Sequence, residues 1–219
     1  MPTTQTFWDQ MGAYNEATLP IQIIMMIAAA VLTYFIFTRR NARANAVMKS
    51  FLSFAFAWNG IVFFLVFAWS IISAIASALF IIIGILFAMD IFKKKTEFRL
   101  PVTKWQRYLT VFLIVLVFLY PLIGMAFGHS YPQTCMPMAP CPLTVFAIAL
   151  VAAAIPQVNR KVYAFLLPWA ILSLPKCLGA LDCYEDCILF VAGVYGLVLL
   201  VRNWKVIGRS QRDEQKLVI

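Results

Sequence analysis

This sequence predicts an all-α fold, a polytopic transmembrane bundle of seven helices that occupies residues 1–219 as a single domain. The composition is 63% hydrophobic and 12% charged, which excludes an ordinary soluble domain. Seven apolar runs are long enough to cross a bilayer. Every lysine and arginine except Lys176 lies in an alternate gap between these runs, or in the tail after the last one. The positive-inside rule therefore places the N-terminus outside and the C-terminus in the cytoplasm.

The first three spans are expected at about residues 20–38, 50–69 and 73–92. A basic gap that begins at Arg39 and closes at Lys49 separates the first span from the second. The apolar stretch 50–92 is divided in two because roughly 20 residues suffice for the hydrocarbon core. Dividing it at an uncharged turn also places Lys49 and the Lys93–Lys95 cluster on the same side of the membrane.

The last four spans are expected at about residues 108–127, 143–156, 162–178 and 188–202. Trp105 and Tyr108 are typical of interfacial anchors and precede the fourth span. The loop after that span contains four prolines, which predict an extended or turn-rich segment. The fifth span is short, and Pro168 and Pro175 predict a kink in the sixth.

The net charge of +9 belongs to the segments next to the membrane, where anionic lipid headgroups attract basic side chains. We therefore expect the lipid bilayer as a partner. Nucleic acid is excluded, because the chain has no folded basic module to read a groove. The one acidic residue near the cytoplasmic end of the third span, Asp90, is expected to pair with Lys93 or Lys94.

The expected outer loops differ in character from the cytoplasmic ones. They hold five of the nine acidic residues, the single histidine, His129, and all five cysteines. An acidic outer face would attract cations and repel anions. The same asymmetry also follows from the positive-inside rule alone, since basic residues are kept from that side.

The cysteines face an oxidising compartment in this topology, so disulfides are permitted. The five candidates are Cys135, Cys141, Cys177, Cys183 and Cys187. We expect at least one disulfide, which either closes Cys135 with Cys141 or joins the two long outer loops, for example Cys135 with Cys183. Because five is an odd number, at least one cysteine stays unpaired or pairs between chains. The alternative is a soft-metal site formed by His129, Cys135 and Cys141.

Few polar residues lie inside the spans, and several enzyme classes are disfavoured. Asn59, next to Trp58 in the second span, must find a hydrogen-bond partner in the bundle interior. The last span holds no lysine for retinal, and His129 is too solitary for an intramembrane zinc hydrolase. A two-aspartate intramembrane protease needs a second aspartate at mid-depth, and Asp90 is isolated. A thiol oxidase usually has a CxxC motif, which this sequence lacks. The sequence assigns no catalytic residue and no cofactor, and it favours a protein that is not an enzyme.

Three blocks carry a resemblance to a known family. They are Tyr120-Pro121-Leu122-Ile123-Gly124, Gly128-His129-Ser130-Tyr131-Pro132 and Pro140-Cys141-Pro142-Leu143-Thr144-Val145-Phe146. With Tyr14-Asn15, Trp58, Pro168-Trp169 and Glu185-Asp186, they make the chain resemble a bacterial family of uncharacterised multi-pass inner-membrane proteins. The resemblance covers nearly the whole chain. It implies a bacterial inner-membrane protein with signature residues gathered at the outer side, and it implies no activity.

These residues predict a vestibule at the outer side of the bundle. We expect it to be ringed by His129, Tyr131, Cys141, Trp169, Glu185 and Asp186, with Trp58 and Asn59 below them. The favoured function is binding or transport of a small molecule or ion through this vestibule. One alternative is a soft-metal-binding or thiol-dependent membrane enzyme that uses His129 and Cys141. The other is a structural or accessory role in the membrane.

Overall fold

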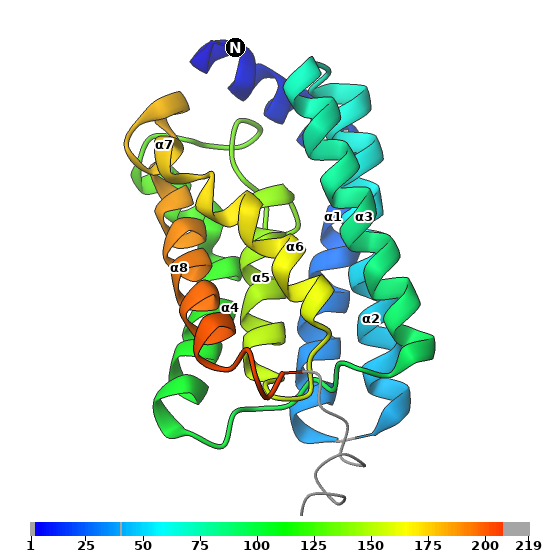
Figure 1. The fold of residues 1–219 in the computed structure, drawn as a ribbon. Helices are drawn as coiled ribbons and strands as arrows, with labels where there is room; N and C mark the ends of the chain where they lie inside the picture. Colours follow the sequence, from blue (N-terminus) through cyan, green and yellow to red (C-terminus); the bar gives the residue numbers. More distant parts are fainter. Residues whose placement is uncertain (1–2, 40, 208–219) are drawn as a thin grey trace, which may run out of the picture.

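The computed structural model describes residues 3–39 and 41–207, and all regular structure in these ranges is helical (Figure 1). The all-α prediction is therefore confirmed for the described residues. The longer helices are α1 (Thr4–Thr38), α2 (Ala42–Trp58), the π-helix η1 (Asn59–Phe67), α3 (Ile71–Lys93), α4 (Lys104–Ala126), α5 (Pro140–Ala153), α6 (Arg160–Ile171) and α8 (Cys187–Arg202). Three short ones precede α8, namely α7 (Leu174–Cys177) and the 3₁₀ turns η2 (Ala180–Asp182) and η3 (Tyr184–Asp186).

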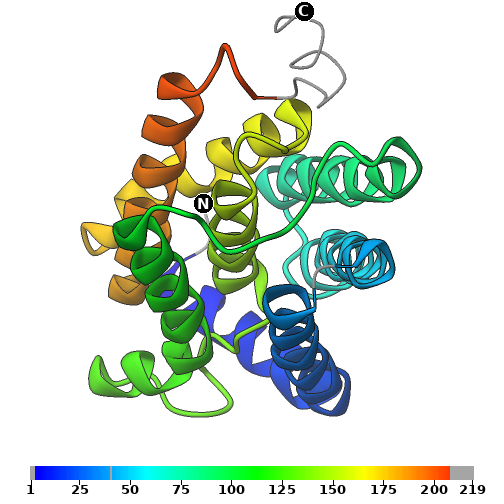
Figure 2. The same ribbon diagram turned by 90° about the horizontal axis from the view of Figure 1, so that it is seen from below.

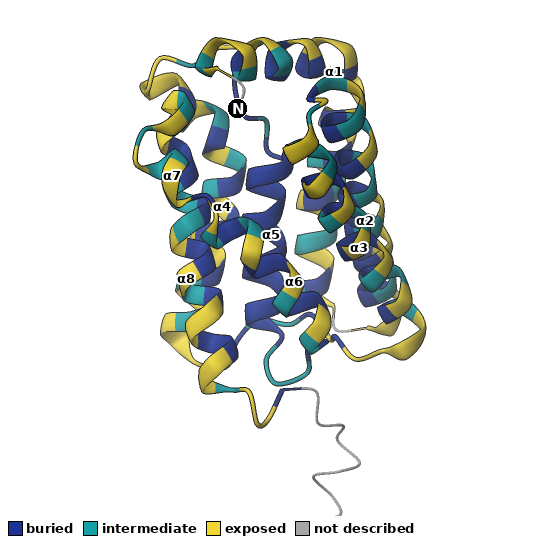
Figure 3. Cartoon of the chain, turned by 45° about the horizontal axis from the view of Figure 1, so that its top comes forward, coloured by how far each residue is buried: buried dark blue, intermediate teal, exposed yellow. Residues whose placement is uncertain are grey.

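Helix α5 forms the centre of the bundle. Its sequence is apolar on every side, which is the pattern of a helix without a solvent-facing surface. All of its 14 residues are buried. It contacts α2, α4, α6 and α8, and the view along the bundle shows it surrounded by the other helices (Figure 2). Figure 3 shows the same contrast, with α5 dark blue and the outward faces of its neighbours largely yellow.

The outward faces of the surrounding helices are covered with large apolar side chains. Ile24 and Ile27 on α1, Ile75 on α3 and Val115 on α4 are all exposed. A continuous apolar surface of this kind needs lipid to cover it. Within residues 3–39 and 41–207, five segments are long and apolar enough to cross a membrane: Thr4–Thr38, Ala42–Phe67, Ile71–Lys93, Lys104–Ala126 and Tyr184–Arg202. These features mark the chain as a membrane protein.

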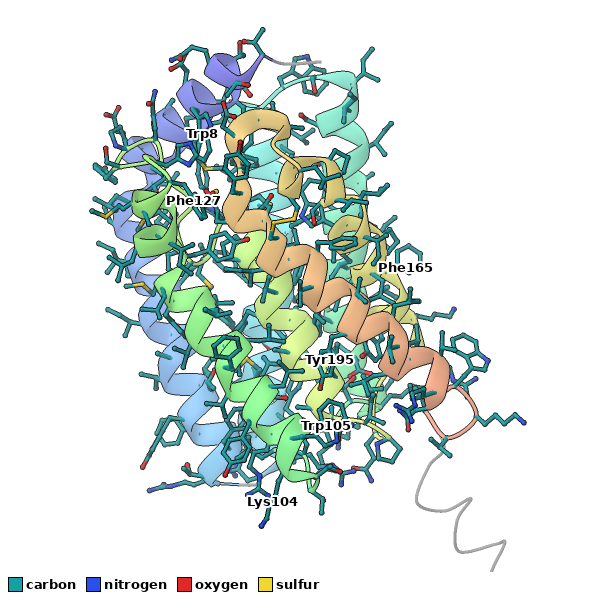
Figure 4. All side chains as sticks on the ribbon, turned by 90° about the vertical axis from the view of Figure 1, so that its left-hand side faces the viewer. Trp8, Lys104, Trp105, Phe127, Phe165 and Tyr195 are labelled. Carbon is teal, nitrogen blue, oxygen red and sulfur yellow. A yellow bond between two sulfur atoms is a disulfide. The ribbon has the colours of Figure 1, made fainter. Side chains whose placement is uncertain are left out.

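The two ends of the bundle have different chemistry. One end, called here the cysteine end, is formed by the start of α1, loop 127–139 and residues 172–187. The other, called the basic end, is formed by loops 94–103 and 154–159 and by the start of α4. Figure 4 shows Trp8 and Phe127 at the cysteine end and Lys104 and Trp105 at the basic end. Trp105, Tyr108 and Trp204 are exposed at the basic end, as interfacial anchors are.

The first helix is much longer than the expected span of residues 20–38. It begins at Thr4, where Thr3 caps it by accepting a hydrogen bond from the backbone of Thr6. The added turns are amphipathic and bury Trp8, Met11 and Tyr14, which pack against the cysteine end. The helix therefore begins well before the expected start of the first span at residue 20.

Other boundaries also differ from the expected ones. Helix α2 begins at Ala42 rather than near residue 50, because Asn41 caps it by accepting a hydrogen bond from Ala44 N at 2.6 Å. The segment that continues α2 is the π-helix η1, which begins at Asn59. The expected sixth span, 162–178, is broken between α6 and α7, where Pro175 cannot continue the helix begun by α6. Helices α5 and α6 have only 14 and 12 residues.

The partner of Asp90 is Lys49 rather than Lys93 or Lys94. Lys49 Nζ lies 3.0 Å from Asp90 Oδ2, and the side chains are 3% and 0% exposed. The carboxylate also accepts hydrogen bonds from the backbone of Thr96 and from the amide of Asn159. One buried ion pair thus joins α2, α3 and both loops of the basic end. Lys93 and Lys94 were expected as partners of Asp90 because they are near it in the sequence. Packing of α2 against α3 instead brings the Lys49 ammonium group to the Asp90 carboxylate.

Candidate ligand pocket and cysteine cluster

A cavity of about 140 Å³ lies at the cysteine end, between the start of α1 and the neighbouring helices. Most of its wall is apolar and comes from α1, η1 and α3, including Phe7, Met11, Phe63, Phe64, Ile72 and Ala76. An apolar cavity of about 150 Å³ is large enough to hold a molecule the size of benzene. One end of the cavity is different, because Cys141, Trp169 and Lys176 line it.

The polar end of the pocket is a network around the buried carboxylate of Asp186. Lys176 Nζ lies 3.2 Å from Asp186 Oδ2. Cys141 Sγ donates to the same oxygen at 3.2 Å, and Tyr120 donates to Oδ1 at 2.9 Å. Asp186 is 0% exposed, so its charge is balanced by Lys176 rather than by water.

Two aromatic rings flank the ammonium group of Lys176. Its Nζ lies 5.5 Å from the ring centroid of Phe7 and 5.4 Å from that of Trp169. At these distances the ring faces attract a cation. Lys176 is therefore held in place by Asp186 on one side and by aromatic faces of the pocket on the other. The result is a hydrogen-bond donor at the end of an apolar cavity.

A second cluster at this end contains two thiols and a carboxylate. One ligand atom each from Cys135, Cys183 and Glu185 lie within 4.8 Å of one another, and all three residues are buried. A hydrogen bond with Cys183 lowers the pKa of Cys135, but burial and the charges of Asp186 and Glu185 raise that pKa to about 11 overall. The Cys135 thiol is therefore protonated at neutral pH.

His129 lies beside this cluster. Its ring stacks on Trp8 with centroids 3.8 Å apart, and its Nδ1 is 3.7 Å from Glu185 Oε1. Burial lowers the pKa of His129, and the charge of Asp182 partly offsets this effect. The imidazole is thus biased toward its neutral form, in which a ring nitrogen can act as a ligand.

Buried amide side chains hold loop 127–139 in place. The Asn15 amide donates to the carbonyl oxygens of Pro132 and Thr134, both at 2.7 Å. Gln22 donates in turn to Asn15 Oδ1 at 3.0 Å. From the other side, Asn59 donates to Met138 O at 3.0 Å. The chain fixes this proline-rich loop through side chains because the loop has no regular backbone pairing of its own.

A family of unknown function, DUF6064, matches residues 4–211 of this chain. The chain belongs to the DUF6064 family. No curated protein and no solved structure matches it. The resemblance to a family of uncharacterised proteins is thereby confirmed, while the bacterial origin and the signature motifs stay predictions.

In this DUF6064 member the predicted vestibule residues fall into separate groups. Trp169 and Cys141 line the pocket, and Asp186 lies directly behind them. Glu185 and His129 belong to the cluster with Cys135 and Cys183. The partners of His129 and of Cys141 therefore differ, and none of the contacts described joins these two residues.

The remaining predicted site residues have structural contacts. Trp58 donates from Nε1 to the hydroxyl of Tyr14 at 3.1 Å, on the side of α2 facing α1. Asn59 is fully buried and supports loop 127–139, so its side chain does point into the bundle. Tyr131 is 50% exposed at the surface of that loop. Neither Trp58 nor Asn59 lines the pocket.

One disulfide is present, but its partners differ from the expected ones. Cys177 pairs with Cys187, while Cys135, Cys141 and Cys183 are free thiols. The chain reverses after α7 at Gly179, whose φ of +99° favours glycine. This turn brings the Cα atoms of Cys177 and Cys187 to 4.5 Å. Cys141 instead points at Asp186, so the expected pairing of Cys135 with Cys141 was wrong.

Three contributors to the site were missing from the sequence-based prediction. Lys176 could have been found, because it is the one basic residue that departs from the charge pattern of the DUF6064 chain. Phe7 gave no such signal, and Tyr120, although it opens one of the three blocks that carry the family resemblance, gave no indication of its partner. Phe7 lies in a segment that the hydropathy pattern left outside the spans, and Tyr120 reaches Asp186 only through the packing of α4 against η3.

Proposed function

We propose that the protein crosses the bacterial inner membrane seven times, with the cysteine end outside. The alternating basic gaps of the sequence support this orientation. Helices α5 and α6, with 14 and 12 residues, are only about 20 Å long. All residues of α5 are buried, so neighbouring helices rather than lipid surround it, whereas α6 buries only one face and exposes Phe165 on the other. The test is to place a tag at each terminus and to add protease to intact spheroplasts. We expect the protease to digest the N-terminal tag and to leave the C-terminal tag intact. The opposite protection pattern contradicts the orientation.

Within this topology, the pocket at the cysteine end binds a small, mainly apolar molecule that carries a hydrogen-bond acceptor. The observation that carries this proposal is the position of Lys176 at one end of a mainly apolar cavity, where it is the only charged side chain among the described lining residues. The side chain has three N–H donors, and Asp186 already balances its charge. A neutral acceptor such as a carbonyl group therefore suits the site better than a second anion.

The size of the cavity limits the ligand. A volume of about 140 Å³ accommodates one ring or a short chain. The ring would lie among Phe7, Phe64 and Trp169, whose faces and edges favour an aromatic partner. The cavity therefore suits a molecule with one aromatic ring and one carbonyl group, or the equivalent end of a longer lipid-soluble molecule.

Fluorine NMR of matched probes tests this proposal. The protein in lipid nanodiscs is mixed with 4-fluoroacetophenone or with 1-ethyl-4-fluorobenzene, which lacks the acceptor, and empty nanodiscs report partition into lipid. A hydrogen bond to a charged donor contributes about 1.5–3 kcal/mol. The ketone should therefore bind at least about tenfold more tightly than 1-ethyl-4-fluorobenzene. Equal affinities for the two probes would contradict the role of Lys176.

A matched pair of variants checks the location. Ala76 lines the cavity, whereas Ala78, two residues along α3, is exposed on the outward face. We expect Ala76→Phe to fill the cavity and abolish specific binding of 4-fluoroacetophenone. Ala78→Phe should leave binding unchanged. Binding that survives in Ala76→Phe would place the probe elsewhere.

A further inference from the structure

Three metal-ligating side chains converge beside the pocket. The thiols of Cys135 and Cys183 and the carboxylate of Glu185 each present a ligand atom within 4.8 Å of the others. The three residues are 1%, 0% and 1% exposed. They come from loop 127–139 and from the turn before α8, two segments far apart in the sequence. A donor set that is buried and assembled from two segments differs from an exposed acidic patch.

The carboxylate of Glu185 lacks the partners that a buried charge needs. Both of its oxygens are buried, and neither accepts a hydrogen bond from the described residues. Nδ1 of His129 is 3.7 Å from Oε1, which is too long for a hydrogen bond. That nitrogen is itself buried without a partner among the described residues. Buried polar groups in native proteins are satisfied by a partner, a water molecule or an ion.

Gly124 lets these groups approach the backbone of α4 closely. A Cβ atom at this position would lie 3.2 Å from Thr134 Oγ1, 3.5 Å from Glu185 Oε1 and 3.8 Å from the Cβ of His129. Thr134 Oγ1 is also buried and has no hydrogen-bond partner among the described residues. The glycine therefore lies against three side chains, those of Thr134, Glu185 and His129, that have unused hydrogen-bonding or ligating capacity.

The distances suit a small tetrahedral ion. With metal–ligand distances of about 2.0–2.3 Å, neighbouring ligand atoms of a tetrahedral zinc site lie about 3.3–3.8 Å apart. The ligand atoms of Cys135, Cys183 and Glu185 reach that range after side-chain shifts of about 1 Å. The His129 ring is 3.7 Å from Glu185 Oε1 but not within 4.8 Å of all three atoms, so it has to move further to complete the site. Two thiolates, a carboxylate and an imidazole match Zn²⁺, whereas Cu⁺ prefers sulfur ligands alone.

We propose that Cys135, Cys183 and Glu185 bind a structural Zn²⁺ ion, with a ring nitrogen of His129 as the fourth ligand. Binding exchanges the two thiol protons for the ion and involves no change in oxidation state. The ion joins loop 127–139 to the turn before α8, so it closes the cysteine end of the bundle. Cys135 also lines the pocket, so the two sites adjoin, but the zinc site uses none of the groups around Lys176 and Asp186 and does not depend on the proposed ligand.

Metal analysis of the full-length protein in nanodiscs tests this assignment. Protein purified without chelators is measured by inductively coupled plasma mass spectrometry, and its cysteines are mapped by alkylation without reduction. The variants are Cys135→Ser, Cys183→Ser and Glu185→Gln, and Cys141→Ser is the matched control because it is a buried thiol of the other network. For variants that do not fold, chelator-treated wild type is titrated with Co²⁺, whose thiolate charge-transfer absorption reports sulfur ligands.

We expect about one zinc ion per chain in the wild type and in Cys141→Ser. The zinc content should fall at least tenfold in each thiol variant, and Co²⁺ should produce the thiolate absorption in the wild type. His129→Ala should weaken zinc affinity about tenfold or more. A disulfide between Cys135 and Cys183 in freshly prepared membranes would overturn the proposal. Wild type without zinc and without Co²⁺ absorption would overturn it equally.

Discussion

Lys176 Nζ lies 3.2 Å from the fully buried carboxylate of Asp186, and this pair connects the turn after α6 to the start of α8. The same carboxylate accepts hydrogen bonds from Tyr120 on α4 and Cys141 on α5. Four helical segments therefore meet at one charge. This arrangement orders the polar end of the pocket and also contributes to the stability of the bundle.

Replacing Asp186 with asparagine should destabilise the protein. The change keeps the shape but leaves the Lys176 ammonium without its counter-ion. Breaking a buried ion pair costs about 3–5 kcal/mol, and the lower end applies here because Lys176 is 21% exposed. Unfolding in mixed micelles with increasing SDS gives the free energy of unfolding. The exposed Asp182→Asn variant is the control and should change it by less than about 0.5 kcal/mol. Equal stability of the two variants would show that the pair contributes nothing.

Asn15→Ala should loosen loop 127–139. The Asn15 amide donates hydrogen bonds to the carbonyl oxygens of Pro132 and Thr134. The change to alanine removes this donor and leaves both oxygens without a hydrogen bond from residue 15. Each buried group left unsatisfied costs about 1–3 kcal/mol, so a loss of roughly 2–5 kcal/mol is expected.

Limited proteolysis and thermal unfolding measure this effect. Cleavage within loop 127–139 should be faster in Asn15→Ala than in the wild type. The control is Glu16→Ala, a change at the neighbouring exposed residue, which should be cleaved at the wild-type rate. Unchanged cleavage in Asn15→Ala would mean that other contacts hold the loop.

Much of the fold could be predicted from the sequence, and the features that were not predicted have specific physical causes. Hydropathy located the long helices because apolar runs and basic gaps alternate regularly. It missed the first turns of α1, where burial of Trp8 and Tyr14 comes from contacts with distant segments. It did not show the π-helix η1, whose backbone pattern is not encoded in hydrophobic periodicity.

The site was only partly predictable for a similar reason. The concentration of cysteines and acidic residues at one end was visible in the loops. The pairing of Cys177 with Cys187 depends on the backbone reversal at Gly179, and the division of Glu185 and Asp186 between two networks depends on side-chain direction. Adjacent residues in a short 3₁₀ turn face different neighbours, and sequence spacing alone did not separate their roles.

The disulfide gives a direct chemical prediction. Alkylation of unfolded, metal-free protein without reduction should label Cys135, Cys141 and Cys183, and prior reduction should add Cys177 and Cys187. For a sequence separation of 10, loss of the bridge in Cys177→Ser/Cys187→Ser should cost roughly 2–3 kcal/mol of unfolding free energy. Peptide mapping that finds all five cysteines alkylated before reduction would contradict the structure of this turn.

Crystals of the protein soaked with 4-iodoacetophenone would show whether a ligand occupies the pocket that ends at Lys176. Anomalous scattering locates the iodine without reference to the rest of the electron density. The iodine should lie among Phe7, Phe64 and Ala76, with the ketone oxygen within hydrogen-bond distance of Lys176 Nζ. The peak should be missing in crystals of Ala76→Phe. Iodine found only on the lipid-facing surface, or a ketone turned away from Lys176, would contradict the account.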